Sequence, residues 1–261
     1  MDLNLVRLCL PIPRAAEQLL TQALASNHAG FEQSLPYLCR RALATDPELV
    51  RRHQKPGLPF IFSIPSAGSM QCTLLGPAIA ELSLIVATVA SLAHLPPISP
   101  LTALDYQGQT VPLRPASAEL PVLSLAQMLD LATPRYAGCR SIRVTVQTPL
   151  RLMAVGREQT RFDGSRFVRA ALRRLSSLAA YYGVAADPEL IIRLIGSSAA
   201  LHLRDAQPLP PGRGWRGMLG SFSLAGESCQ ELGPWLEVGS LLHLGKGAAF
   251  GQGAFQVVPV S

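Results

Sequence analysis

Apolar and polar residues alternate along several short stretches of this chain, and each such stretch predicts a β-strand. The clearest stretch is 140–152, where Ile142, Val144 and Val146 share one face and Arg143 and Thr145 lie on the other. The other predicted strands cover 3–12, 58–65, 71–75, 110–113, 215–225 and 254–260.

Apolar residues at helical spacing predict helices between these strands. The cleanest helix covers 166–182, with Phe167, Ala171 and Leu175 along one face. Further helices are expected at 14–25, 31–44, 74–95 and 123–131, and a helix-like segment at 232–244. The stretch 74–95 is apolar enough to suggest a membrane span, but Glu81 near its middle favours a buried helix of a soluble protein.

Each half of the chain therefore has the order strand, helix, strand or strands, helix, strand. This order predicts an α+β fold of two tandem ferredoxin-like (RRM-like) domains, with antiparallel sheets and helices packed on one face. The proline-rich, weakly patterned stretch 96–121 is the best candidate for a boundary. We expect an N-terminal domain at 1–118 and a C-terminal domain at 119–261.

Composition is that of a folded protein, because 48% of the 261 residues are hydrophobic and only 15% are charged. The five cysteines are scattered and show no zinc-ligand spacing, so we expect neither a metal site nor a cofactor. They indicate reduced thiols of a cytoplasmic protein. The N-terminus shows no targeting segment.

The positive charge is carried almost entirely by arginine, with 21 Arg against 2 Lys and a net charge of +6. Arginine fits phosphate with a rigid fork of donors and stacks on bases, so the balance favours a nucleic-acid ligand. A GC-rich coding bias would also raise the arginine count, but it would not cluster the residues. Arg166, Arg169 and Arg173 recur along one helix face with Arg174 beside them. A solvated helix face is the alternative interpretation.

A glycine-rich stretch at 244–255 separates two apolar segments near the end of the chain. Gly245, Gly247, Gly251 and Gly253 surround one lysine, Lys246. Successive backbone amides beside a lysine suit a phosphate group. A tight turn before the last strand explains the same glycines, so both interpretations stay open at this point.

Three segments in this region carry a resemblance to a known family. They are WRGMLGSF at 215–222, LEVGSLLHLGKG at 236–247 and FGQG at 250–253. In order and spacing they resemble the C-terminal signature of the CRISPR repeat-RNA-processing endoribonucleases of the RAMP superfamily. TPLRL at 148–152 and LPYLCRRAL at 35–43 are similar to other parts of that family.

The resemblance implies an enzyme that cuts the repeat of precursor CRISPR RNA without a metal ion. The 2′-OH attacks the adjacent phosphate and leaves a 2′,3′-cyclic phosphate and a 5′-OH, which requires a base, an acid and cations. The residues that match the arrangement in several family members are Tyr37, His53 and Lys55. His53 would be the base or the acid, and Lys55 or Arg40 would stabilise the phosphate charge. His243 lies among apolar residues and is expected to be structural.

The expected RNA-binding residues are Arg41, Arg51, Arg52, Arg161, Arg166, Arg169, Arg173, Arg174, Arg213, Arg216, Gly245, Lys246, Gly247, Gly251 and Gly253. The expected partners are CRISPR repeat RNA, the crRNA product and other Cas subunits of an effector complex, with no membrane. A non-cleaving RNA-binding scaffold subunit of the same superfamily is the alternative function. An unrelated α/β protein with a glycine-rich anion loop is a third.

Overall fold

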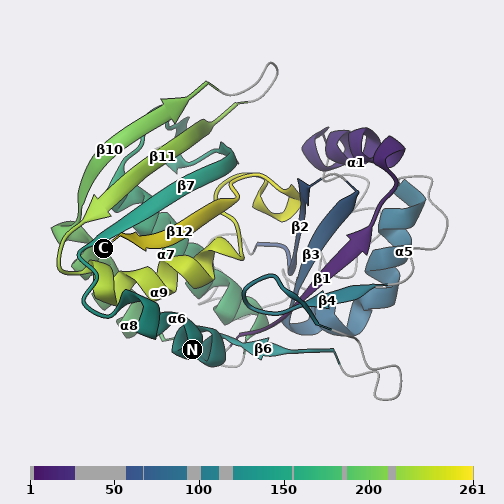
Figure 1. The fold of residues 1–261 in the computed structure, drawn as a ribbon, viewed down its shortest axis with the longest axis horizontal. Helices are drawn as coiled ribbons and strands as arrows, with labels where there is room; N and C mark the ends of the chain where they lie inside the picture. The colour runs from purple at the N-terminus through teal and green to yellow at the C-terminus, as the bar shows by residue number, and fades with distance from the viewer. Residues whose placement is uncertain are drawn as a thin grey trace.

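A computed structural model describes residues 3–26, 57–66, 68–92, 101–111, 120–154, 156–183, 187–210 and 216–260 of the chain. Two antiparallel sheets lie side by side in it, each with helices packed against it (Figure 1). Both sheets have the strand order of a ferredoxin-like domain. The predicted α+β fold with two ferredoxin-like domains is confirmed.

The first sheet is built around β1, which pairs with β3 on one side and with β4 on the other. Its order is β2-β3-β1-β4-β5, and β6 also pairs with β1. The strands are β1 (Asn4–Pro11), β2 (Phe60–Ser66), β3 (Ser69–Leu75), β4 (Thr102–Leu104), β5 (Thr110–Val111) and β6 (Leu123–Ser124). Helix α1 (Arg14–Ser26) follows β1, and α5 (Leu82–Leu92) follows β3 through the 3₁₀ turn η1 (Gly76–Glu81).

The second sheet has the order β10-β11-β7-β12. Its strands are β7 (Ser141–Leu150), β10 (His202–Leu209), β11 (Met218–Ala225) and β12 (Phe255–Val260). Its helices are α6 (Leu125–Ala132), α7 (Gly164–Tyr182), α8 (Pro188–Ser197) and α9 (Cys229–Ser240). A short hairpin of β8 (Met153–Ala154) and β9 (Arg157–Glu158) lies between β7 and α7 in the chain. Three 3₁₀ turns accompany these elements: η2 (Thr133–Tyr136), η3 (Ser198–Ala200) and η4 (Ala248–Phe250).

The side-chain pattern explains the central elements of this second domain. Ile142, Val144 and Val146 of β7 are buried, as the alternation predicts, and they share a core with Phe167 of α7 and Phe222 of β11. Phe167 packs edge-on against Phe222 with ring centroids 5.2 Å apart. The strand and the amphipathic helix thus form two layers around one apolar core.

A further apolar cluster joins the two domains. It contains Leu5 and Leu75 from the first sheet and Leu175, Leu178 and Val238 from helices of the second domain. The chain also returns to the first sheet at β6, after the expected boundary between 118 and 119. That boundary stays a prediction, and the described parts of the two domains share a continuous interior.

The expected helix at 74–95 begins later than its apolar pattern suggested. Strand β3 runs to Leu75, and the chain then turns at Gly76, whose φ is +48°. A Cβ at Gly76 would lie 2.3 Å from the carbonyl oxygen of Tyr182, so the turn is fixed by close packing against α7. In the described part of the chain, no helix is long and apolar enough to cross a membrane. Strand β10 extends to Leu209, into the Pro/Gly-rich stretch at 207–214.

Candidate functional site

The glycine-rich stretch forms the loop between α9 and β12, and its backbone requires glycine. Gly245, Gly247, Gly251 and Gly253 have φ values of +85°, +83°, +86° and +64°. Residues with a Cβ pay an energetic cost in this left-handed region. The sequence signature therefore corresponds to four left-handed positions within one short loop.

The loop packs tightly against the end of β7. A Cβ at Gly253 would lie 1.7 Å from the carbonyl oxygen of Leu244, and one at Gly245 would lie 2.5 Å from that of Arg151. The backbone N–H of Lys246 donates to the carbonyl of Arg151 at 3.0 Å, and that of Gly253 donates to Pro149 at 3.1 Å. The loop is thereby held against the TPLRL segment that the sequence singled out.

Several amides of the loop are occupied within the protein. The N–H groups of Ala248, Phe250 and Gln252 donate to carbonyl oxygens of Gly245 and Gly247, at 3.4, 2.9 and 3.2 Å. This geometry supports the tight-turn interpretation of the glycines. The Lys246 side chain is exposed, and its binding of phosphate stays a prediction.

The tip of the loop reaches the first domain (Figure 1). Ala249 and Phe250, in η4, belong to the apolar core of the first sheet. The Phe250 ring meets the Phe60 ring of β2 edge-on, with centroids 6.1 Å apart. A Cβ at Gly251 would lie 3.1 Å from the carbonyl oxygen of Phe62. The loop is therefore an inter-domain contact as well as a turn.

His243 lies immediately before the loop and is buried, as expected of a structural residue. Burial, and after it the nearby Arg174 guanidinium, lowers its pKa to about 3. The imidazole is therefore neutral, and its Nδ1 has no hydrogen-bond partner among the described residues. Its φ of +51° is unusual for a residue with a side chain.

The Arg174 side chain does not lie with the exposed arginines of the α7 stripe, where the sequence predicted it. Its side chain turns inward, its Nε donates to the carbonyl of Leu242 at 2.8 Å, and burial lowers its pKa to about 10. One of its terminal nitrogens is buried without a partner among the described residues. Arg174 thus contacts the end of α9, directly before the glycine-rich loop.

The remaining arginines of the α7 stripe are exposed. Arg166, Arg169 and Arg173 all lie on the outer face of the helix. Asp163, which caps α7, pairs with the Arg166 side chain at 3.1 Å, so an acid does neutralise one member of the stripe. Arg161 and Arg216, also expected to bind RNA, are exposed.

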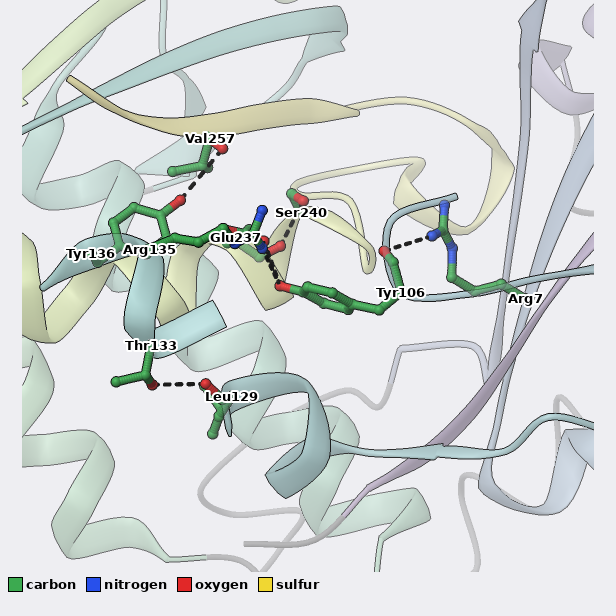
Figure 2. A network of polar contacts seen from close by, with 9 residues as sticks. All are labelled: Arg7, Tyr106, Leu129, Thr133, Arg135, Tyr136, Glu237, Ser240 and Val257. Atoms are coloured by element: carbon green, nitrogen blue, oxygen red, sulfur yellow. Dashed lines mark hydrogen bonds and ion pairs between the residues drawn. The ribbon is translucent and has the colours of Figure 1, made fainter. Parts of the chain in front are cut away.

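A polar network joins the domains at a second place (Figure 2). The Tyr106 hydroxyl, after β4, donates to Glu237 of α9 at 2.6 Å, and Arg135 of η2 pairs with the same carboxylate. Arg7 of β1 donates to the carbonyls of Asp105 and Tyr106 at 2.9 and 3.1 Å. Burial raises the pKa of Tyr106 to about 12, so its hydroxyl stays a donor at neutral pH.

Several predicted site residues lie outside the described residues: Tyr37, Arg40, Arg41, Arg51, Arg52, His53, Lys55 and Arg213. The described chain resumes at Gly57, whose carbonyl accepts a hydrogen bond from the Tyr182 hydroxyl at the end of α7. A Cβ at Gly57 would lie 3.1 Å from a terminal nitrogen of Arg174. The catalytic assignments therefore stay predictions.

The sequence did not single out Arg157, in β9 of the hairpin, or Gln159, directly after it. Together with Arg161 and Arg166 they line an open groove of about 440 Å³ next to the start of α7. A Gly-Arg pair at 156–157, shortly after the TPLRL segment at 148–152, was the available signal. This pair of residues is too short to show a periodicity, so the sequence does not distinguish a ligand-binding hairpin from an ordinary turn.

Comparisons with known proteins agree with this architecture. Residues 144–255 match the family model for CRISPR-associated endoribonuclease Cas6. No curated protein matches the chain at a significant level. The matched segment runs from β7 to the start of β12 and contains α7, the β8–β9 hairpin and the glycine-rich loop.

Solved structures resemble the chain over nearly its whole length. A Cas6 structure with a substrate mimic covers 97% of this chain and 99% of its own at 14% identity, with a TM-score of 0.52. Cas6 of Thermus thermophilus covers 99% and 98% at 15% identity, with a TM-score of 0.51.

A partial complex of Cas6-RT-Cas1 with Cas2 has a TM-score of 0.61 at 13% identity. It covers 99% of this chain, which spans 46% of that longer protein. At these identities the solved structures establish a shared fold. The resemblance to CRISPR repeat-RNA-processing endoribonucleases is thus confirmed by the Cas6 family match over residues 144–255.

Proposed function

We propose that this chain is an endoribonuclease that processes precursor CRISPR RNA by cutting within the repeat. The observation that carries the proposal is the Cas6 family match over residues 144–255, which includes the four left-handed glycines of the loop. The fold shared with Cas6 structures over 97% of the chain supports it.

The proposed reaction is attack of a ribose 2′-OH on the adjacent phosphorus. The 2′-oxygen–phosphorus bond forms, the bond to the 5′-oxygen breaks, and the products carry a 2′,3′-cyclic phosphate and a 5′-OH. We assign the base or acid to His53, whose ordinary pKa lies near neutrality, and we include Tyr37 among the catalytic residues. Lys55 or Arg40 would stabilise the charge that develops on the phosphate. No metal ion or cofactor takes part in the proposed step.

RNA binding is proposed for the exposed cations of the second domain. Lys246 lies on the glycine-rich loop, and Arg169 and Arg173 lie on α7 without ion-pair partners among the described residues. Such cations release condensed counterions when they bind RNA phosphates. The proposed partners are the repeat RNA and other Cas proteins, supported by the Cas6 structures with a substrate mimic and with Cas1 and Cas2.

The test is incubation of the protein with its cognate repeat RNA in EDTA. A single cut is expected, and His53→Ala should slow it by at least about 100-fold, the usual contribution of a general acid or base. His202→Ala, at an exposed histidine on β10, is the matched control and should cut at the wild-type rate. Tight binding without cleavage would favour the scaffold function instead, and absence of binding would contradict both.

A further inference from the structure

The groove beside the β8–β9 hairpin has the features of a ligand site, beyond the general role of the α7 arginines. Its volume is about 440 Å³, and it is open to solvent along its length. It is lined by the segment 157–163 and by Arg166. An open groove suits a segment of a polymer better than an enclosed small molecule.

The groove carries two uncompensated positive charges. Its two acids are already paired, because Glu158 binds Arg151 through two hydrogen bonds of 3.1 and 3.0 Å and Asp163 pairs with Arg166. Arg157 and Arg161 are exposed and have no ion-pair partner among the described residues. An anionic group would therefore find two free guanidinium forks here.

The same groove holds a polar atom that lacks a partner. The side-chain oxygen Oε1 of Gln159 is buried and accepts no hydrogen bond from the described residues. The backbone N–H of Gln159 donates to the Leu152 carbonyl at 2.9 Å, which fixes the residue in place. A buried acceptor without a donor is costly, so a ligand N–H that reached it would gain affinity.

An aromatic residue that lines the groove packs against the core of the second domain. Phe162 is half-buried, and its ring lies 4.9 Å from the ring of Phe222 in the domain core. A side chain fixed in this way can contact a base without losing further conformational freedom. The groove thus offers cations, a hydrogen-bond acceptor and an apolar contact close together.

We propose that this groove binds one unstacked nucleotide of single-stranded RNA next to the repeat hairpin. The inference rests on the proposed function and names a subsite of it. The phosphate lies on Arg157 and Arg161, and an N–H on the base edge donates to Gln159. Single-stranded RNA is favoured over a duplex, because base pairing occupies the Watson–Crick edges of an A-form helix. Arg166 lines the groove and begins the α7 stripe, so the backbone has a basic surface to follow.

The test compares two RNAs by fluorescence anisotropy over a range of salt concentrations. One is the repeat hairpin with its single-stranded flanks, and the other is the hairpin alone. For Arg157→Gln/Arg161→Gln we expect weaker binding of the flanked RNA, with a salt slope lower by about 0.7, the value for one lost phosphate contact on a single strand. For Gln159→Leu we expect about a 10-fold loss on the flanked RNA alone. Binding of the bare hairpin should not change.

The matched control is Arg140→Gln/Arg193→Gln, which removes two exposed arginines that do not line the groove. It should leave binding of both RNAs within about 2-fold of the wild type, as expected for surface changes away from a site. The groove proposal alone would be overturned if the groove variants bound the flanked RNA as tightly as the wild type does. It would also be overturned if they lost the same affinity for both RNAs, or if the control variant lost as much affinity as they do. A wild-type protein that binds neither RNA would overturn the proposed function together with the groove.

Discussion

The ring of Phe250 in the glycine-rich loop packs against the ring of Phe60 in the first sheet, with centroids 6.1 Å apart and an interplanar angle of 84°. The two residues belong to different domains. Phe250 is almost fully buried by this contact and shares the core of the first sheet with Phe62. A loop that the sequence suggests for phosphate binding therefore also fixes one domain against the other.

Replacing Phe250 by alanine should lower the free energy of unfolding by about 3–5 kcal/mol, because a buried aromatic ring is lost and a cavity remains. Lys246→Ala, four residues away and exposed, should change it by no more than about 0.5 kcal/mol. Urea denaturation measures both values. A loss below about 1 kcal/mol for Phe250→Ala would contradict the inter-domain contact.

The glycines of the loop can be tested with a matched pair of substitutions. Gly253 and Gly138 have similar φ values, +64° and +71°. A Cβ would lie 1.7 Å from a carbonyl oxygen at Gly253 but meets nothing within 4 Å at Gly138. Gly138→Ala should cost about 1–2 kcal/mol for its left-handed backbone. Gly253→Ala should cost clearly more, on the order of 4 kcal/mol, because the clash adds to the same strain. Equal costs in thermal denaturation would argue against the tight loop.

The polar network between the domains predicts a loss of stability when the Tyr106 hydroxyl is removed. Tyr106→Phe takes a 2.6 Å hydrogen bond from the buried carboxylate of Glu237 and should lower stability by about 1–3 kcal/mol. Tyr136→Phe removes only a 3.4 Å bond to the Val257 carbonyl, so its cost should be smaller. Chemical denaturation of both variants at neutral pH measures the difference, and the reverse order would refute the assignment.

His243 should make the protein less stable at mildly acid pH. Its pKa is about 3 when folded against an ordinary 6.5, so the unfolded chain binds a proton between these values and the folded chain does not. Stability from this group is therefore complete above pH 6.5 and falls as the pH decreases towards 3.

Between pH 7 and pH 5.5 the loss should be about 1 kcal/mol for this one group. His243→Asn does not titrate in this range, and asparagine tolerates a positive φ. The difference in unfolding free energy between the two pH values should therefore be about 1 kcal/mol smaller in this variant. An unchanged difference would show that His243 does not hold the low pKa.

The exposed α7 stripe should contribute to RNA affinity through charge alone. Arg166→Gln/Arg169→Gln/Arg173→Gln should weaken binding of the repeat hairpin, with a lower salt slope, and should leave thermal stability nearly unchanged because the side chains are exposed. Filter binding at several salt concentrations measures the slope. An unchanged affinity and slope would mean that the stripe is a solvated face.

Strong periodicity made much of the fold predictable. The alternation in β7 and the apolar face of α7 predicted these elements to within two residues, because local pattern and burial agree there. The start of α5 was missed, because apolar residues predominate from β3 through η1. The Gly76-Pro77 pair was the available signal of a turn, and the structure packs Gly76 against Tyr182 there.

The candidate site was predictable only in part. The loop glycines stand out in the sequence because positive φ demands that residue type. The burial of Phe250 in the other domain could not be predicted, because one apolar residue in a glycine-rich stretch has no periodicity. Arg174 illustrates the same limit: it is adjacent to Arg173 in sequence, yet it turns into the domain junction and contacts Leu242.

The central claim is that this chain cuts CRISPR repeat RNA by attack of the 2′-OH. The most direct measurement is the mass of the 5′ fragment after incubation of the cognate repeat RNA with the protein in EDTA. The proposed function predicts one fragment ending in a 2′,3′-cyclic phosphate and a partner fragment with a 5′-OH. A 3′-OH end with a 5′-phosphate on the partner fragment, or intact RNA bound tightly to the protein, would contradict it.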